Sequence, residues 1–368
     1  SDAATLPEWR VRALQELGTV DLYDSLRLDR LRAARAQASD IGALATMAMV
    51  DLQLAAAHNE RGETIEAIDA ARRCTEVAGP LGLSTLAMGH AVEAMAHARR
   101  GDERAMQQAL DAALATGQDA AYVAASVSGN MLPILHLVRG ELAEAAAVLD
   151  RGMDELRSRP TATFPFPGLW ALVRTLLDDG GDAARAEVGA LSVDTPASRR
   201  TLVAADAVAF GQAGNAGGAA SRFAEVDAEL DFEGGQFRRS FLRLLVAPAA
   251  RRDGWGTPEP WLRESLARFE LLGLDALAGR CRQELRRIGA AVPRRSAIAA
   301  SSVPPALAAL GVTAREVDVL RLAASGSTSR EIAERLYISP RTVDKHVERL
   351  VQKTGVPRSG FTRLLSEA

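Results

Sequence analysis

A row of polar side chains near the carboxyl end of the chain has the spacing needed to contact the edges of DNA bases. Arg341, Asp344, Lys345 and Glu348 lie at positions i, i+3, i+4 and i+7 of a segment with helical periodicity. Residues at these offsets share one face of a helix. Arginine and lysine donate to guanine, and carboxylates accept from the cytosine amino group. The stripe therefore predicts a helix that contacts base edges in the major groove.

A second set of side chains in this region could contact the sugar-phosphate backbone. Cationic, hydroxyl and imidazole groups commonly bind phosphate oxygens, and the candidates are Arg330, Thr342, His346, Arg349 and Lys353. The stripe itself leaves one choice open, because Asp344 either accepts from a cytosine amino group or turns away from the DNA. An alternative for the whole pattern is a small helical domain with a solvated polar face.

The third of four short helices, predicted over 340–354, positions most of these residues. Ser339 can cap it, and Pro340 takes the first helical position, where its missing N–H has no cost. Its apolar residues must face the domain core, and these are Val343, Val347 and Leu350. A short second helix that braces it across a tight turn is the arrangement of a helix-turn-helix.

Capping boxes mark the beginnings of the first two helices. In each box a threonine and a glutamate satisfy free backbone amides reciprocally, and the two boxes are Thr313-Ala-Arg-Glu316 and Thr328-Ser-Arg-Glu331. Gly326 ends the first helix. A fourth helix is expected from Ser359.

The C-terminal segment resembles the LuxR-type helix-turn-helix family. The resemblance rests on the first capping box, on Gly326, and on Glu331-Ile-Ala333, Ile338-Ser-Pro-Arg-Thr-Val343, Lys345-His346 and Lys353-Thr-Gly355-Val356. It implies that 340–354 is a recognition helix, that double-stranded DNA is the partner, and that a homodimer forms on DNA through 359–368. Three departures are Asp344 in place of a basic residue, Ser359-Gly360 in place of Ser-Arg, and Thr354 in place of leucine, which predicts a weaker local core.

Residues 1–290 are predicted to form a series of helical hairpins. The pattern His-x-x-Arg-Gly-acid recurs at a constant spacing of 39 residues, with its glycine at 62, 101 and 140. Glycine readily supplies the left-handed turn between two helices. Weaker copies place glycines at 180, 214 and 254. Stacked hairpins of this kind build an α-solenoid, and the segment resembles tetratricopeptide-type repeats, although the unit is longer.

The expected architecture is therefore all-α. An α-solenoid of tetratricopeptide-like hairpins (1–290) would receive a signal, a Pro- and Ser-rich linker (291–305) would follow, and a four-helix LuxR-type domain (306–368) would bind DNA.

Two features of the repeats could bind ligands. The repeat histidines His58, His97 and His136 invite a metal site, but equivalent positions in successive repeats are more commonly packing sites, so no metal is expected. An aromatic and proline-rich stretch could form a ligand or partner surface through Phe164, Phe166 and Trp170. The alternative is a loop whose rings fill a gap between repeats.

Composition excludes several other functions. The only lysines, Lys345 and Lys353, follow no glycine-rich loop, so a P-loop is absent from this sequence. No run of about 18 apolar residues predicts a membrane span, so a cytoplasmic protein is expected. No constellation of a nucleophile and a base indicates an enzyme, and no cofactor is expected.

The combination of repeats and a C-terminal LuxR-type domain is similar to the large LuxR regulators that carry an N-terminal ATPase, the maltose-regulator-like group. The segment Arg12-Ala-Leu-Gln-Glu-Leu-Gly-Thr-Val20 resembles the start of their repeat region. The sequence is thus expected to be part of such a regulator or a short member without the ATPase. We expect a sequence-specific transcriptional regulator controlled by a ligand or partner on the repeats. A repeat scaffold for protein assembly is the alternative.

Overall fold

The computed structural model describes residues 6–118, 120–158, 166–191, 195–291, 307, 310–324, 327–336 and 340–366. All regular elements in these ranges are helices, so the prediction of an all-α chain is confirmed. The chain divides into two units, 1–292 and 293–368. Phe164, Gly326, Ser339 and all but the first residue of the predicted linker lie outside the described residues.

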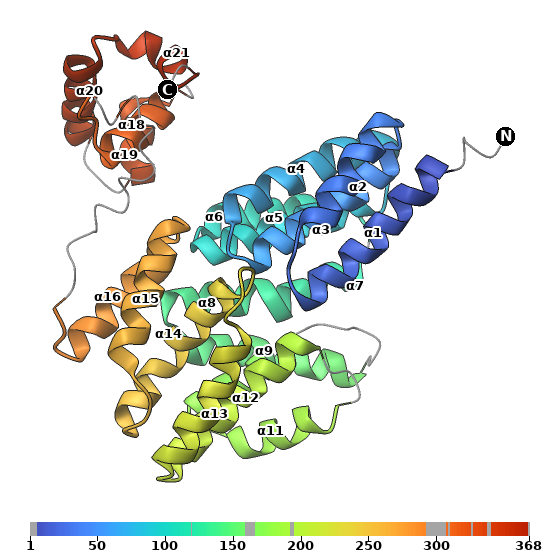
Figure 1. Ribbon diagram of the computed structural model, residues 1–368, viewed down its shortest axis with the longest axis vertical. Helices are drawn as coiled ribbons and strands as arrows, with labels where there is room; N and C mark the ends of the chain where they lie inside the picture. The colour runs from blue at the N-terminus through green and yellow to red at the C-terminus, as the bar shows by residue number, and fades with distance from the viewer. Residues whose placement is uncertain are drawn as a thin grey trace. The chain divides into compact units, whose positions relative to one another are not determined.

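The first unit, called here the repeat domain, is a succession of antiparallel helical hairpins (Figure 1). Consecutive helices pack in pairs, as in α3 with α4 and in α5 with α6. Its helices are α1 (Leu6–Asp24), α2 (Asp29–Asp40), α3 (Leu44–Glu60), α4 (Thr64–Leu81), α5 (Thr85–Arg100), α6 (Glu103–Ala115), α7 (Ala120–Ser126), the π-helical turn η1 (Val127–Met131), α8 (Leu132–Arg139), α9 (Leu142–Ser158), α10 (Phe166–Leu176), α11 (Gly181–Gly189), α12 (Pro196–Gln212), α13 (Ala216–Glu229), α14 (Gln236–Arg252), α15 (Pro258–Leu271) and α16 (Asp275–Arg287).

The repeat glycines have the left-handed conformation that the sequence predicts. The φ angles of Gly62, Gly101 and Gly140 are 76°, 74° and 84°. The three weaker copies, at 180, 214 and 254, also have positive φ angles. Each turn joins the two helices of one hairpin, so the hairpin register derived from the 39-residue spacing is confirmed.

The structure shows a second reason for these three glycines, which is the close approach of other helices. A Cβ atom on Gly62 would lie 2.5 Å from the ring of Phe237 on α14. On Gly101 it would lie 3.3 Å from Ala276 of α16, and on Gly140 it would lie 3.4 Å from Arg280 of the same helix. Sequence spacing predicts the turns, whereas only the tertiary structure shows what packs on them.

The last hairpins of the repeat domain therefore return to the early ones. Figure 1 shows α14 to α16, in yellow and orange, beside α8, and α16 contacts both α5 and α8. The Nη2 atom of Arg238 on α14 donates to Oε2 of Glu60 on α3 at 2.7 Å, across 178 residues of sequence. This ion pair helps to close the array upon itself.

Two of the repeat histidines pair with the acidic residue of their own turn. Nδ1 of His58 lies 2.6 Å from Oε2 of Glu63, and Nδ1 of His136 lies 2.7 Å from Oε2 of Glu141. In the second repeat the shorter Asp102 instead caps α6, by accepting the N–H of Ala105. These contacts give the histidine and acid positions of the repeat a role in the turns. Among the described residues no cluster of three metal-binding side chains occurs.

The stretch from Ala121 to Arg139 is long and apolar enough to cross a membrane by length and composition alone, with a mean hydropathy of 1.3. It comprises most of α7, the turn η1 and α8, and 56% of the apolar window is buried inside the repeat domain. Its packing against α5 and α9 is that of a core helix.

The second unit contains α18 (Ala314–Ala324), α19 (Ser329–Leu336), α20 (Pro340–Thr354), the short 3₁₀ turn η3 (Arg358–Gly360) and α21 (Phe361–Ser366). Its core is formed by side chains from all four α-helices, among them Val317, Ile332, Val343 and Phe361, each with no exposed surface. The four helices expected from the sequence are thus present.

Candidate nucleic-acid interface

Both predicted capping boxes are present, and they fix where the first two helices of this unit begin. The Thr313 N–H donates to Oε2 of Glu316 at 2.8 Å, and the Glu316 N–H donates back to Oγ1 of Thr313 at 3.4 Å. The Thr328 and Glu331 pair repeats the arrangement, at 2.7 Å and 3.3 Å. Reciprocal caps of this kind fix the residue at which each helix begins.

Helix α20 spans the residues predicted for the third helix, and its apolar stripe is buried. Val343 and Leu350 have no exposed surface, and Val347 packs against the same core while partly exposed. This prediction is confirmed. Because the core holds one side of the helix, the opposite side faces outward.

The four candidate base-reading residues occupy that outward side. Arg341, Asp344, Lys345 and Glu348 are all exposed. None of them forms an ion pair or side-chain hydrogen bond with another residue in the described part of the chain. Donors and acceptors are therefore available along one face of a 15-residue helix.

The candidate phosphate contacts differ in their surroundings. Arg349 and Arg330 are exposed, whereas Thr342 and His346 are half-buried beside the outward face. All four lie on α19 or α20, the two helices that form the helix-turn-helix. Their contact with phosphate remains a prediction.

Lys353 has intramolecular partners that the sequence did not indicate. Its Nζ lies 2.7 Å from Oε2 of Glu316 and 2.8 Å from the carbonyl oxygen of Gly311. The Glu316 side chain is only 3% exposed, so Lys353 neutralises a buried carboxylate. We therefore expect Lys353 to stabilise the domain, with its ammonium engaged away from phosphate.

The carboxylate of Glu316 is held in its charged form. Burial raises its pKa, but the hydrogen bonds from Lys353 and Thr313 outweigh that effect, so the pKa of Glu316 lies below its ordinary value. The same oxygen thus serves the capping box and the ion pair with α20. Removal of this one side chain would loosen two helices at once.

The last helix is fixed by polar contacts. The guanidinium of Arg358 donates to Oγ of Ser329 at 2.9 Å and to the carbonyl oxygen of Ser327 at 2.7 Å. Oγ1 of Thr362 donates to the carbonyl oxygen of Ala324 at 3.0 Å. Thr354, which departs from the family pattern, uses its hydroxyl to bond the Leu350 carbonyl at 2.7 Å. Its polar atom is thus satisfied at the end of α20.

The candidate effector residues lie in different places. Phe166 is 3% exposed and lines a cavity inside the repeat domain. Trp170 is also buried, but its indole N–H donates to Oδ1 of Asp150 at 2.7 Å and the Arg157 guanidinium stacks 5.5 Å from its ring centroid. Both of these contacts are with α9. Leu169 lines the cavity together with Phe166, and Trp170 is not among the lining residues. Phe164 lies outside the described residues.

Phe166 also fits the alternative interpretation, in which an aromatic ring fills a gap between repeats. A Cβ atom on Gly129 of η1 would lie 2.6 Å from this ring, and one on Gly152 of α9 would lie 3.2 Å from it. Phe166 therefore fills a gap between two glycines and lines the cavity at the same time.

Sequence reasoning missed the charged residues of this cavity. Glu60, Arg99, Arg200 and Arg238 come from α3, α5, α12 and α14 and converge only in the folded chain. Each of the three arginines stands in an Arg-Arg pair, but such pairs also occur elsewhere in the chain, so they gave no specific signal.

Comparisons with known proteins agree with the geometry of the second unit. Residues 311–359 match the family described as bacterial regulatory proteins, luxR family. A protein of Mycobacterium tuberculosis named as an HTH-type transcriptional regulator is 44% identical over 46 residues, which is 12% of this chain. The match spans 5% of that relative's length. No solved structure matches the chain. The C-terminal unit is thus a LuxR-family helix-turn-helix domain, a DNA-binding fold.

Proposed function

We propose that this chain is a sequence-specific transcriptional regulator that works without catalysis in the cytoplasm and that α20 enters the major groove. The observation that carries the proposal is the division of α20 into a buried apolar side and an exposed polar side with four hydrogen-bonding residues. The family match of residues 311–359 supports the same function.

The test compares the full chain on duplexes from the promoters next to its own gene with random duplexes of equal length. Each phosphate contact should contribute about −0.9 to the slope of log affinity against log salt concentration. We expect tight, salt-sensitive binding to at least one promoter fragment. Equal affinity for promoter and random duplexes would contradict the proposal and favour a scaffold protein.

Two cations on α20 should affect DNA binding in different ways. Lys345→Ala is expected to reduce discrimination between the preferred site and its single-base variants by about 1–3 kcal/mol, because Lys345 lies in the base-facing stripe. Arg349→Ala should weaken all duplexes equally and lower the salt slope by about 1. Fluorescence anisotropy titrations measure both effects.

The matched comparison keeps the charge change the same in the two variants. If Lys345→Ala weakened specific and random DNA equally, the groove assignment would be wrong. If Arg349→Ala altered the preferred sequence, Arg349 would belong to the base-reading face.

The repeat domain would then receive the signal that controls binding. The cavity lined by Phe166 and Leu169 is a suitable place, because it is concave, mostly apolar and lined by a few polar groups. A ligand that binds there contacts helices from both ends of the repeat domain, and so can bias how the array closes.

A homodimer on DNA through 359–368 is the remaining part of the proposal. Helix α21 buries Phe361 in its own domain and leaves Thr362 and Arg363 exposed, so the partner would meet the polar side of the helix. Sedimentation of the protein on a duplex with one site and with two half-sites tests this stoichiometry.

A further inference from the structure

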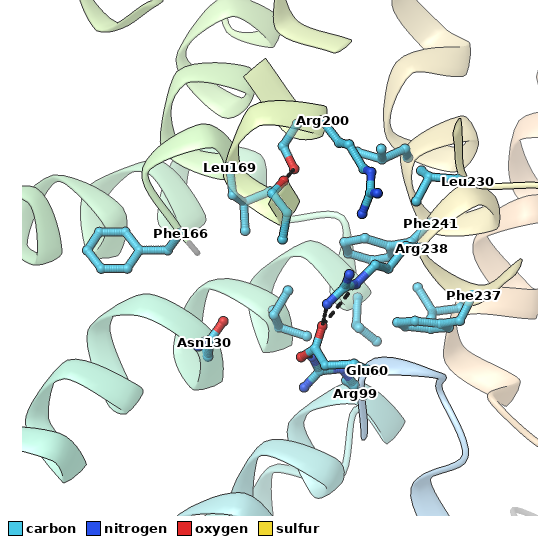
Figure 2. A pocket seen from close by; sticks show the side chains of 16 residues that line it. Glu60, Arg99, Asn130, Phe166, Leu169, Arg200, Leu230, Phe237, Arg238 and Phe241 are labelled. Carbon is cyan, nitrogen blue, oxygen red and sulfur yellow. Dashed lines mark hydrogen bonds and ion pairs between the residues drawn. The ribbon is translucent and has the colours of Figure 1, made fainter. Parts of the chain in front are cut away.

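The cavity in the repeat domain has a cluster of arginines against apolar walls. Its volume is about 100 Å³. Figure 2 shows Arg200 extending from one wall toward the Arg238 and Glu60 pair, with Arg99 behind Glu60. Phe166, Leu169, Phe237 and other aliphatic or aromatic side chains form the remaining walls. Such a lining suits a small molecule with an apolar body.

Several guanidinium N–H groups at this cavity lack an acceptor among the described residues. In Arg99, whose side chain is 6% exposed, Nη2 donates to Oε1 of Glu60 at 2.7 Å, while Nε and Nη1 are buried and unpaired. Nη1 of Arg200 is also buried and unpaired, although its Nε lies 3.3 Å from Glu229. A buried donor without an acceptor has a cost in folding free energy. An oxygen-rich ligand group would remove this cost.

The charges inside the cavity do not balance. Glu60 accepts from both Arg99 and Arg238, and although burial raises its pKa, these two cations bring the pKa below its ordinary value. It is therefore an anion. Counting Glu229 as the partner of Arg200, the three arginines and two carboxylates leave one positive charge. A ligand with one negative charge would neutralise the cluster.

A polar residue from an unusual backbone conformation lies at the same cavity. Asn130 belongs to the π-helical turn η1 and lines the wall opposite Phe237 and Phe241 (Figure 2). Single π-helical turns within α-helices often occur at functional sites. The amide of Asn130 can donate to, or accept from, a polar group of the ligand.

We infer that the cavity binds a small organic acid with one carboxylate and an apolar body. The carboxylate would accept hydrogen bonds from Arg200, on the side of the Arg238 and Glu60 pair away from Arg99, and the apolar part would contact Phe166 and Leu169. Arginine suits this task because its planar fork matches a carboxylate. This inference deepens the proposed function by naming the class of ligand. It rests on the proposed function only where the acid is taken as the signal that controls DNA binding.

The test uses the full chain and calorimetric titration with two acids, octanoate and 4-phenylbutanoate. Their uncharged counterparts, octanamide and 4-phenylbutanamide, have the same bodies. We expect at least one acid to bind tenfold or more tightly than its amide. The inference is overturned if neither acid binds, or if the amides bind as tightly as the acids.

Variants assign the binding to the cavity. Arg200→Gln should weaken the acid tenfold or more and leave the amide unchanged, whereas Arg200→Lys should retain much of the affinity. Arg139→Gln is the matched control, because Arg139 pairs with exposed Glu103 away from the cavity. An equal loss in the control would overturn the assignment. Unfolding curves from tryptophan fluorescence check that each variant remains folded.

Promoter binding measured with and without the bound acid separates this inference from the proposed function. Acid binding that leaves DNA affinity unchanged supports the inference and contradicts control by this ligand. Specific DNA binding by a protein that binds neither acid overturns the inference and leaves the regulator proposal intact.

Discussion

Replacing Gly168 with alanine is expected to lower the free energy of unfolding of the repeat domain by about 3 kcal/mol. Gly168 lies in α10 where α12 crosses it, and its N–H donates to Oγ of Ser198 at 2.9 Å. An added Cβ would lie 2.0 Å from the carbonyl oxygen of Ser198 and 2.9 Å from its Cα. Because these are backbone atoms, no side-chain rotation relieves the clash, and the two helices must separate.

Urea denaturation followed by tryptophan fluorescence measures this effect on the repeat domain alone. The four tryptophans of the chain, at 9, 170, 255 and 261, all belong to that domain. Gly279→Ala is the control, because this helical glycine of α16 has open space around its Cβ position. There the substitution should stabilise by about 0.4–1 kcal/mol. Similar destabilisation in both variants would show that the crossing of α10 and α12 is not the cause.

Replacing Glu316 with glutamine is expected to destabilise the DNA-binding domain by about 3 kcal/mol. Glutamine keeps the size of the side chain and can still serve a capping box. It removes the charge that pairs with Lys353, however, and leaves that ammonium next to a neutral amide. Faster hydrogen exchange in α18 and α20 of the full chain would report the loss, together with weaker binding to all duplexes.

The second capping box offers a matched control. Glu331→Gln makes the same change at an exposed glutamate whose box is built in the same way. Its expected cost is within about 0.5 kcal/mol, as for most surface substitutions. If both variants exchanged at the same rate, the buried ion pair of Glu316 with Lys353 would contribute no more stability than the contacts of the exposed Glu331.

The pKa of Glu316 also predicts how acid affects this domain. Its pKa in the folded domain is lower than its ordinary value in an unfolded chain. Its stabilising contribution is therefore fully present above that unfolded value, and is lost as the pH falls through the lower folded pKa. Relative to the intrinsic exchange rate at each pH, the protection of amides in α18 should decrease over this range in the wild type and change less in Glu316→Gln.

Lys353 shows how the structure alters the interpretation of one residue. From the sequence, its charge near the end of α20 favours a contact with phosphate. In the folded domain its ammonium contacts Glu316 and the Gly311 carbonyl. A loss of DNA affinity in Lys353→Ala would therefore reflect a less stable domain as well as any lost phosphate contact, and Arg349 is the better probe of phosphate binding.

The sequence alone determined the local features of this protein. Capping boxes such as Thr313 with Glu316 join residues three positions apart, and repeat glycines such as Gly101 adopt their turn from their own conformational freedom. The sides of α20 follow from helical periodicity. Each of these features depends on residues within a few turns of one another, so pattern and spacing were sufficient.

The tertiary structure decided what lies far apart in the chain. Glu60 and Arg238 are 178 residues apart, and their pairing results from the return of α14 to the early hairpins. The cavity that Phe166 and the excess of arginines line forms only because of that closure. No periodicity encodes such contacts, since they depend on the summed rotation of every intervening hairpin. The helix proposed to bind DNA can thus be recognised in the sequence, whereas the cavity proposed to control it is visible only in the fold.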